Sequence, residues 1–567
     1  MQAEAAAPPA AADRTAPPDR PPGAEQPLGH VSPAEWGWLA AVGVGLLALL
    51  AVPYVAWLVG GPADLVHVGS FWYPRDFTVY LAAMQQGAQS ASWLIYDRFT
   101  PEPHAPVFMF PVYVAIGKLA AVLGVAPLAV YYAAEVLGRA ALLATLYGFA
   151  ATFLTTVGQR RLALGLMLVG TNLGLWVAVL IEPFARQMDA AEGLGLGAEL
   201  EVMTLGVFLA PLHLMLGLAC TLLCVVAFAG AVRPGAGWRA YAALAAAIVG
   251  LALVHPFNLP VVLAVFGAYA GVAWLRTRRW PGGAALAVVV ASAVALPFLL
   301  YNYYTFRIEP FWSVVYGQQN TVPSPSPLRL VMDYGPVLLL APLVLRAWPR
   351  PWTDRQWLAV LWAGLLLLAL YAPVPFQRRL AYGLQPGLAV LAAASLAWWY
   401  GRLGPRGRRR LAAGMLALAL PTAAFLYAGM VLSAATNAPV EVYVASRPEW
   451  EAGEWLATRM APDEVVLATE DSGFWLAALI PGRVWLGHKG ITYDVEGKRQ
   501  VVDAVLAGPP ADIAHLLTAH GIRYLYYGPR ERALGAVEET PALRRVYTTP
   551  DVTIFQVAST TEPPAPR

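Results

Sequence analysis

The stretch WYPRDFTVYLAAMQQGAQSASWLIYDRFTPEPHAP, residues 72–106, decides the fold because it separates one hydrophobic run from a long series of others. It holds much of the acidic and polar chemistry in the first half of the chain. The run before it, at about residues 36–59, is long enough to cross a bilayer as a helix. We therefore expect residues 72–106 to form a loop outside the membrane that carries functional side chains.

Composition places the chain in a membrane. Of its 567 residues, 58% are hydrophobic and only 13% are charged, and the mean hydropathy is +0.55. Soluble domains carry about 25% charged residues, so this chain lacks the charge to cover a water-facing surface. The net charge of +3 is too small to indicate a nucleic-acid partner. Both cysteines, Cys220 and Cys224, lie in one hydrophobic run and are expected to pack as small apolar residues.

The hydrophobic runs predict eleven membrane spans. They lie at about 36–59, 127–156, 162–181, 204–232, 238–254, 259–275, 282–303, 328–345, 356–372, 380–400 and 411–434. Residues 107–125 are short for a span and contain Pro111 and Lys118, so we expect a helix that lies on the membrane surface.

The arginines predict the orientation. With 107–125 outside the bilayer, one set of loops carries most of them, and the positive-inside rule makes that side cytoplasmic. The arginine-rich loops hold Arg160, Arg161, Arg233, Arg239, Arg276, Arg278, Arg279, Arg346, Arg350, Arg355, Arg402, Arg406, Arg408, Arg409 and Arg410.

The predicted fold is a polytopic α-helical membrane protein with a small C-terminal α/β domain outside the cytoplasm. Residues 1–33 form a disordered cytoplasmic tail, and 34–435 a transmembrane domain whose first outer loop is 60–126. Strand-like and helix-like runs alternate over 436–558 and predict a largely parallel sheet. Residues 559–567 form a disordered tail.

Asp76 opens the apolar run FTVYLAAM, and two interpretations remain open. It caps a helix, or it accepts a proton from a hydroxyl group. In the second interpretation the neighbouring Arg75 keeps the carboxylate ionised.

An acid in the first outer loop, followed by surface helices and many spans, resembles the GT-C superfamily of membrane glycosyltransferases. DFTVYLAAMQQG, YDRFTPEPH, LVHPFN, PFQRRLAYG, GHKGITYD and IRYLYYGPRER are similar to segments of bacterial multi-span proteins classed as glycosyltransferases. The resemblance implies an inverting enzyme of the bacterial inner membrane, with Asp76 as catalytic base. Its donor is a polyprenyl-phosphate sugar, and its acceptor is a glycan, lipid or protein.

Gln377, Arg378 and Arg379 form the best second site, because guanidinium groups bind phosphate bidentately. The alternative is that the arginines reach ordinary lipid headgroups. Further candidates for substrate binding are Arg75, Tyr80, Glu102, His104, Glu182, His255, Asn258, Arg307, Tyr382 and His488.

Each candidate has a plainer interpretation. Glu102 and His104 fit a solvated loop, Glu182 fits an interfacial acid, and His255 with Asn258 fits a polar turn between two spans. His213 fits a hydrogen-bond partner inside the bundle. The loop that carries His488 either folds down over the membrane site or is purely structural.

We predict no metal site. Glu102 and His104 are nevertheless residue types that bind divalent metals, so metal binding stays an open alternative. No nucleotide-binding motif is present. Two other function classes stay open: a transporter or flippase for lipid-linked glycans, and a non-catalytic scaffold of cell-envelope assembly. A transporter predicts polar groups at span centres and an internal repeat, and a scaffold predicts no requirement for Asp76.

Overall fold

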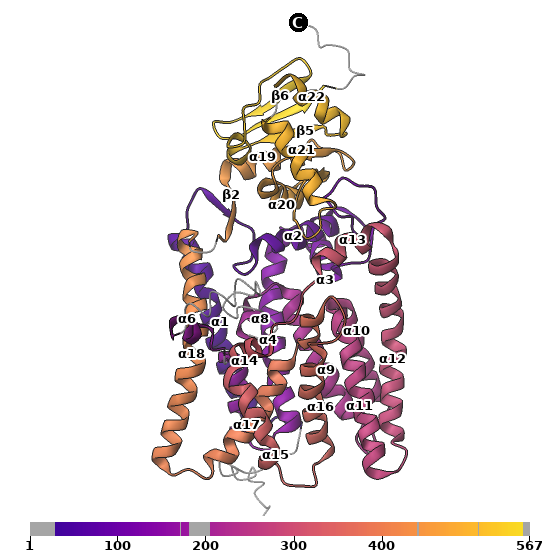
Figure 1. Ribbon diagram of the computed structural model, residues 1–567, viewed down its shortest axis with the longest axis vertical. Helices are drawn as coiled ribbons and strands as arrows, with labels where there is room; N and C mark the ends of the chain where they lie inside the picture. Colours follow the sequence, from indigo (N-terminus) through magenta and orange to yellow (C-terminus); the bar gives the residue numbers. More distant parts are fainter. Residues whose placement is uncertain (1–28, 171, 181–203, 439–440, 508–509, 559–567) are drawn as a thin grey trace, which may run out of the picture.

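The computed structural model describes residues 29–170, 172–180, 204–438, 441–507 and 510–558. Figure 1 shows a bundle of long helices below and a small α/β domain above it. The predicted fold class is therefore confirmed. Both predicted disordered tails lie, apart from residues 29–33, outside the described residues.

Each of the eleven predicted spans overlaps one or more helices, and the spans predicted at 162–181 and 204–232 are each divided between two helices within the described residues. Eight helical segments are long and apolar enough to cross a membrane, or nine if the bent pair α5 and α6 is one span, counting the described residues only. Of the rest, α10 and α16 have only 17 and 16 residues, so the count of eleven stays a prediction. The bundle consists of α1 (Pro33–Gly60), α4 (Pro127–Phe153), α5 (Val157–Val169), α6 (Gly174–Leu180), α8 (Thr204–Leu209), α9 (Leu212–Ala231), α10 (Trp238–Val254), α11 (Leu259–Thr277), α12 (Gly282–Tyr303), α14 (Pro327–Leu340), α15 (Val344–Ala347), α16 (Asp354–Ala369), α17 (Leu384–Tyr400) and α18 (Pro405–Thr436).

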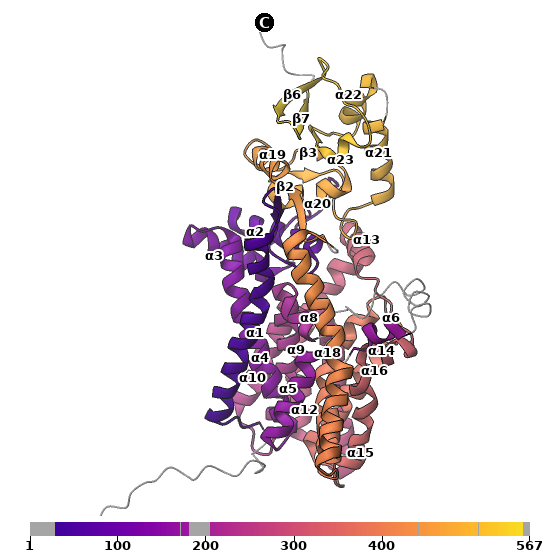
Figure 2. The ribbon, with the colours of Figure 1, turned by 90° about the vertical axis from the view of Figure 1, so that its left-hand side faces the viewer.

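Residues 107–125 do not run along the bundle. The helix they contain, α3 (Pro111–Leu123), lies at the upper end and across the direction of α1 (Figure 2). It packs tightly on α2 (Pro74–Gln89), because a Cβ on Gly117 would come within 1.9 Å of the Met84 carbonyl oxygen. The arrangement agrees with the predicted surface helix.

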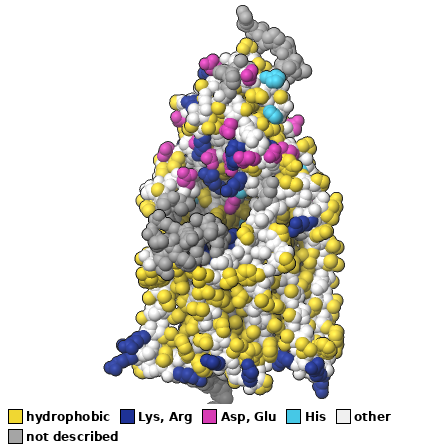
Figure 3. All heavy atoms as spheres, in the orientation of Figure 1, with side chains coloured by type: hydrophobic (Ala, Val, Ile, Leu, Met, Phe, Trp, Pro, Cys, Tyr) yellow, Lys and Arg dark blue, Asp and Glu magenta, His cyan; other side chains and the backbone are white. Residues whose placement is uncertain are grey.

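The two ends of the molecule differ in the charge of their exposed side chains. Basic side chains gather at the lower end, while acidic and basic side chains mix at the upper end (Figure 3). A buried ion pair at the start of α1 joins Glu35 to Arg160 of α5 at 3.0 Å, and Tyr147 donates to the same carboxylate at 2.7 Å. The pattern fits the predicted orientation, which stays a prediction.

The C-terminal domain has a mixed sheet. Its five strands have the order β4-β3-β5-β7-β6, in which β3 pairs in parallel with β4 and β5, while β7 runs antiparallel to β5 and β6. The prediction of a largely parallel sheet was wrong, because the last two strands form a hairpin. The elements are α19 (Arg447–Ala457), β3 (Val465–Leu467), α20 (Glu470–Leu479), β4 (Arg483–Val484), α21 (Val495–Ala507), α22 (Pro510–Ala519), β5 (Tyr524–Tyr527), α23 (Pro529–Arg532), β6 (Leu543–Thr548) and β7 (Thr553–Val557).

A second, two-stranded sheet joins the domain to the first outer loop. There β1 (Leu65–His67) pairs antiparallel with β2 (Tyr443–Ser446). Segments nearly 400 residues apart in the sequence therefore meet directly above the bundle (Figure 1).

Candidate active site

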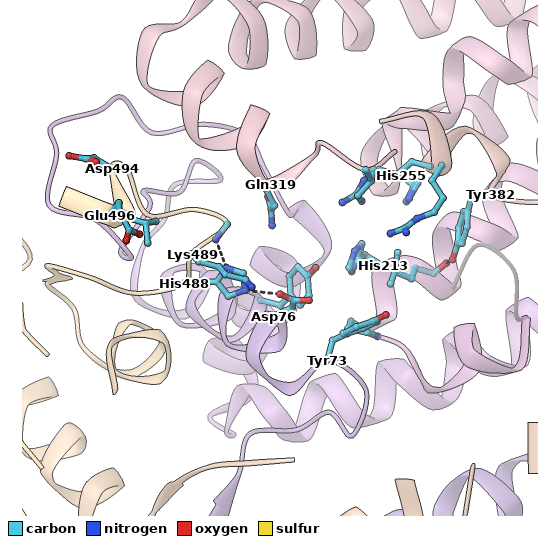
Figure 4. A pocket seen from close by; sticks show the side chains of 18 of the residues that line it. Tyr73, Asp76, His213, His255, Gln319, Tyr382, His488, Lys489, Asp494 and Glu496 are labelled. Atoms are coloured by element: carbon cyan, nitrogen blue, oxygen red, sulfur yellow. Dashed lines mark hydrogen bonds and ion pairs between the residues drawn. The ribbon is translucent and has the colours of Figure 1, made fainter. Parts of the chain in front are cut away.

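A cavity of about 890 Å³ lies where the C-terminal domain meets the upper end of the bundle (Figure 4). Its wall combines the start of α2, the start of α9, the end of α10, the 3₁₀ turn η4 (Gln377–Ala381) and the loop after β4. The lining residues are Tyr73, Asp76, Tyr80, Pro211, His213, Leu214, His255, Gln319, Val322, Arg378, Arg379, Tyr382, His488, Lys489, Gly490, Asp494, Val495, Glu496 and Arg499.

Asp76 lies in the first turn of α2 and faces this cavity. The helix begins at Pro74, and the N-cap residue is Tyr73, which has left-handed backbone angles and no side-chain cap bond. The Asp76 carboxylate instead meets His488, with Oδ1 at 2.6 Å from Nε2. The interpretation of Asp76 as a helix cap was therefore wrong.

His488 comes from the loop that follows β4. The Gly487 amide donates to the Thr492 hydroxyl at 3.1 Å, and that hydroxyl donates to the Phe99 carbonyl at 2.8 Å. The loop thus rests on the first outer loop and reaches down to the cavity, as one of the two sequence interpretations expected.

Arginine and aromatic side chains form the membrane-side wall. The Arg379 guanidinium lies over the Phe257 ring, 5.0 Å from its centroid. His255 stacks on Tyr382 with ring centroids 4.8 Å apart, and Asn258 holds the turn by donating to the Tyr382 carbonyl at 2.7 Å. Arg378, Arg379, His255 and Tyr382 therefore line one cavity together with Asp76, and their roles in binding stay predictions.

Tyr80 lies in α2, one turn after Asp76, and stacks on Tyr113. Burial raises the pKa of Tyr80; the negative charge of Asp76 raises it further, and the positive charge of Arg379 opposes this. The pKa of Tyr80 therefore depends on both of these charged groups in the cavity wall. His213, which also lines the cavity, adjoins Tyr80 and hydrogen bonds through Nδ1 to the Tyr113 hydroxyl of α3 at 2.9 Å. The role of His213 therefore stays a prediction.

Several predicted binding residues do not line this cavity. Arg75 turns away from Asp76 and pairs with Asp471 at 2.8 Å. The Gln377 side chain accepts a hydrogen bond from the Ser324 amide at 3.1 Å. It therefore anchors the turn and does not face the cavity. Arg307 lines a separate apolar groove. Asn258 serves the polar turn, and Glu182 lies outside the described residues.

Glu102 and His104 instead form the docking loop, which we define as residues 97–104. Glu102 pairs with the buried Lys498 of the C-terminal domain at 2.6 Å. His104 accepts from the Asp97 amide at 2.9 Å and stacks on Phe311. Placing Glu102 and His104 in the substrate cavity was therefore wrong, because neither lines it. The Glu102 carboxylate holds the C-terminal domain, and both ring nitrogens of His104 are bonded within the docking loop.

The docking loop carries perturbed charges. Burial raises the pKa of Asp97 to about 7, although the Phe99 amide and the charge of Lys498 oppose the rise. Burial lowers the pKa of Lys498, and its bond to Glu102 opposes that shift. Both groups lie in an environment that disfavours charge.

Among the polar residues that line the cavity, Tyr73, Gln319, Glu496 and Arg499 were not predicted as candidates. Of these, only Glu496 and Arg499 could have been recognised from the sequence. They follow the GHKGITYD segment and are three residues apart from each other. Within the described residues, no group of three or more His, Cys, Asp or Glu side chains could hold a metal ion.

No family model and no curated protein matches the sequence. Solved structures do match the fold. The archaeal oligosaccharyltransferase AglB from Archaeoglobus fulgidus, in complex with an inhibitory peptide and a dolichol-phosphate, has a TM-score of 0.55 at 12% identity; the match covers 87% of this chain and 70% of that chain. The apo form of the Archaeoglobus fulgidus enzyme has a TM-score of 0.52 at 12% identity and coverages of 94% and 76%.

The arabinofuranosyltransferase AftD from Mycobacteria has a TM-score of 0.51 at 16% identity, with 95% of this chain and 42% of that chain covered. The chain therefore has the fold of the GT-C superfamily of membrane glycosyltransferases, which its sequence resembles.

Proposed function

We propose that this protein is a membrane glycosyltransferase that moves a sugar from a polyprenyl-phosphate donor to an acceptor hydroxyl. The observation that carries the proposal is one cavity, at the membrane surface of a GT-C fold, lined by both Asp76 and the pair Arg378 and Arg379. A carboxylate is suited to accept a proton, and guanidinium groups are suited to hold a phosphate.

In the proposed reaction, Asp76 takes the proton of the acceptor hydroxyl. The acceptor oxygen forms a bond to the anomeric carbon from the face opposite the phosphate, so the configuration inverts. The bond between that carbon and the phosphate oxygen breaks, and its electron pair leaves with the polyprenyl phosphate. Arg378 and Arg379 stabilise the charge that builds on the leaving phosphate.

The two walls of the cavity support this division of roles. The arginines lie on η4, next to apolar and aromatic side chains of the bundle, which suits a lipid-linked group. Lys489, Glu496 and Arg499 belong to the C-terminal domain, which suits a polar acceptor. The archaeal structure that matches in fold holds a dolichol-phosphate and an inhibitory peptide, and we propose equivalent classes of ligand here.

We further propose that the protein lies in a bacterial inner membrane with its N-terminus cytoplasmic and its C-terminal domain outside. The basic lower end of the bundle supports this orientation (Figure 3).

The test uses purified protein in lipid nanodiscs with a panel of synthetic decaprenyl-phosphate hexoses and pentoses. Transfer to water or to an added acceptor is measured as release of free decaprenyl phosphate. At least one donor is expected to be consumed by the wild type and not by Asp76→Asn. Equal release by both proteins would contradict the proposal.

A further inference from the structure

The geometry points to His488 as a positioning residue. Its neutral imidazole ring donates a hydrogen bond to the Asp76 carboxylate and thereby orients that carboxylate. This inference rests on the proposed function of Asp76. It makes the C-terminal domain part of the catalytic apparatus, because the domain supplies the group that orients the base.

The hydrogen bonds of His488 define its tautomer. The Gly490 backbone amide lies 3.1 Å from Nδ1. A backbone N–H can only donate, so Nδ1 must accept and carries no proton. The remaining proton of the neutral ring is therefore on Nε2, which lies 2.6 Å from Asp76 Oδ1 and donates to it.

This tautomer suits a base. A cationic imidazolium would form a full ion pair with Asp76 and make the carboxylate a poorer proton acceptor. A proton on Nδ1 would also point at the Gly490 amide, which is itself a donor, so the hydrogen bond between them would be lost. The neutral ring occupies one carboxylate oxygen and fixes its plane, which leaves the second oxygen for the acceptor hydroxyl. Asp76 keeps 47% of its side chain exposed, whereas His488 keeps only 12%.

The position of His488 depends on the docking loop. A Cβ on Gly487 would lie 2.9 Å from the Val484 side chain and 3.0 Å from the Phe99 ring, so a larger residue would have to displace them. The Phe99 carbonyl accepts from Thr492, and the Val484 amide donates to the Arg98 carbonyl at 2.9 Å. The base is thus oriented only while the domain is docked on the first outer loop.

The kinetic test compares His488→Ala, His488→Gln and Asp76→Asn in nanodiscs, with the donor from the panel that the wild type consumes. The Gln amide places a non-ionisable donor near the position of Nε2. His515→Ala is the matched control, since His515 is exposed on α22 of the same domain.

We expect His488→Ala to lower kcat about 100-fold, with the KM for the donor unchanged. His488→Gln is expected to recover most of the loss, and the melting temperatures of all variants should stay near that of His515→Ala. If His488→Ala matches His515→Ala while Asp76→Asn is inactive, the role of His488 is overturned and the proposed function stands. Equal inactivity of His488→Ala and His488→Gln with a lowered melting temperature would instead show a structural role and overturn it. Full activity of Asp76→Asn removes the proposed function and this inference together.

A second readout needs no donor. In ¹⁵N spectra of histidine-labelled protein, the resonances missing from His488→Gln are assigned to His488. We expect a bare Nδ1, a protonated Nε2, and a shift of Nε2 in Asp76→Asn. A protonated Nδ1 overturns the inference.

Discussion

Replacing Arg379 with methionine is expected to weaken phosphate binding with little loss of stability. The Arg379 guanidinium lies over Phe257, and its Nε has no hydrogen-bond partner among the described residues. Its removal therefore leaves no carboxylate unpaired in that part of the chain. A charge held in this way is costly to the fold and is best explained by a ligand.

The magnitude follows from the interactions that are lost. A hydrogen bond to a charged group contributes about 2 kcal/mol, which corresponds to a roughly 30-fold weaker Kd for a polyprenyl phosphate. On the other side, the fold loses only the cation–π contact with Phe257, worth about 0.5–1 kcal/mol.

The assay measures binding of decaprenyl phosphate and the melting temperature for Arg379→Met and two controls. Arg307→Met changes an exposed arginine of a separate groove and is expected to leave both values unchanged. Arg329→Met breaks a buried pair with Asp333 at 3.0 Å and should cost about 3 kcal/mol of stability. A Kd for Arg379→Met equal to that of Arg307→Met would refute the reasoning.

Three further predictions concern the docking loop and the bundle. The pKa of Asp97 is about 7 in the native state and about 3.8 in the unfolded state, so the stability of the wild type should fall as pH rises through this window. Asp97→Asn should make the melting temperature less dependent on pH between pH 4 and 8. The same pH dependence in both proteins would contradict this. Glu102→Gln removes the anionic partner of the buried Lys498 and should favour undocking by about 2 kcal/mol. Undocking is measured as faster hydrogen exchange over residues 95–105 but not in α11. Arg160→Met leaves the buried Glu35 carboxylate without its cationic partner and should cost about 3 kcal/mol of stability; a denaturation midpoint equal to that of the wild type would disprove the role of this pair.

The bundle could be predicted from the sequence because each span is a local signal. A run of apolar residues must satisfy its own backbone hydrogen bonds in a bilayer, so it forms a helix wherever its neighbours lie. The surface helix at Pro111–Leu123 followed from its length and from the arginine distribution. The antiparallel pairing of β7 with β5 was not predicted, because the sequence of a short strand does not indicate which other strand it pairs with.

The candidate site was only partly predictable. Asp76, Arg379 and His255 were recognised because charged or polar groups at the ends of apolar runs are unusual. The contact between Asp76 and His488 spans 412 positions and depends on domain docking, which no local pattern encodes. Glu102 looked like a ligand for the same chemical reason that makes it a good partner for Lys498.

The central claim is that donor phosphate and base share this one cavity. It is tested most directly by the structure of the Asp76→Asn variant in nanodiscs, trapped with the decaprenyl-phosphate sugar that the wild type consumes. The account predicts phosphate density against Arg378 and Arg379, with the anomeric carbon of the sugar facing residue 76. Phosphate bound elsewhere, such as at the basic lower end of the bundle, would contradict it.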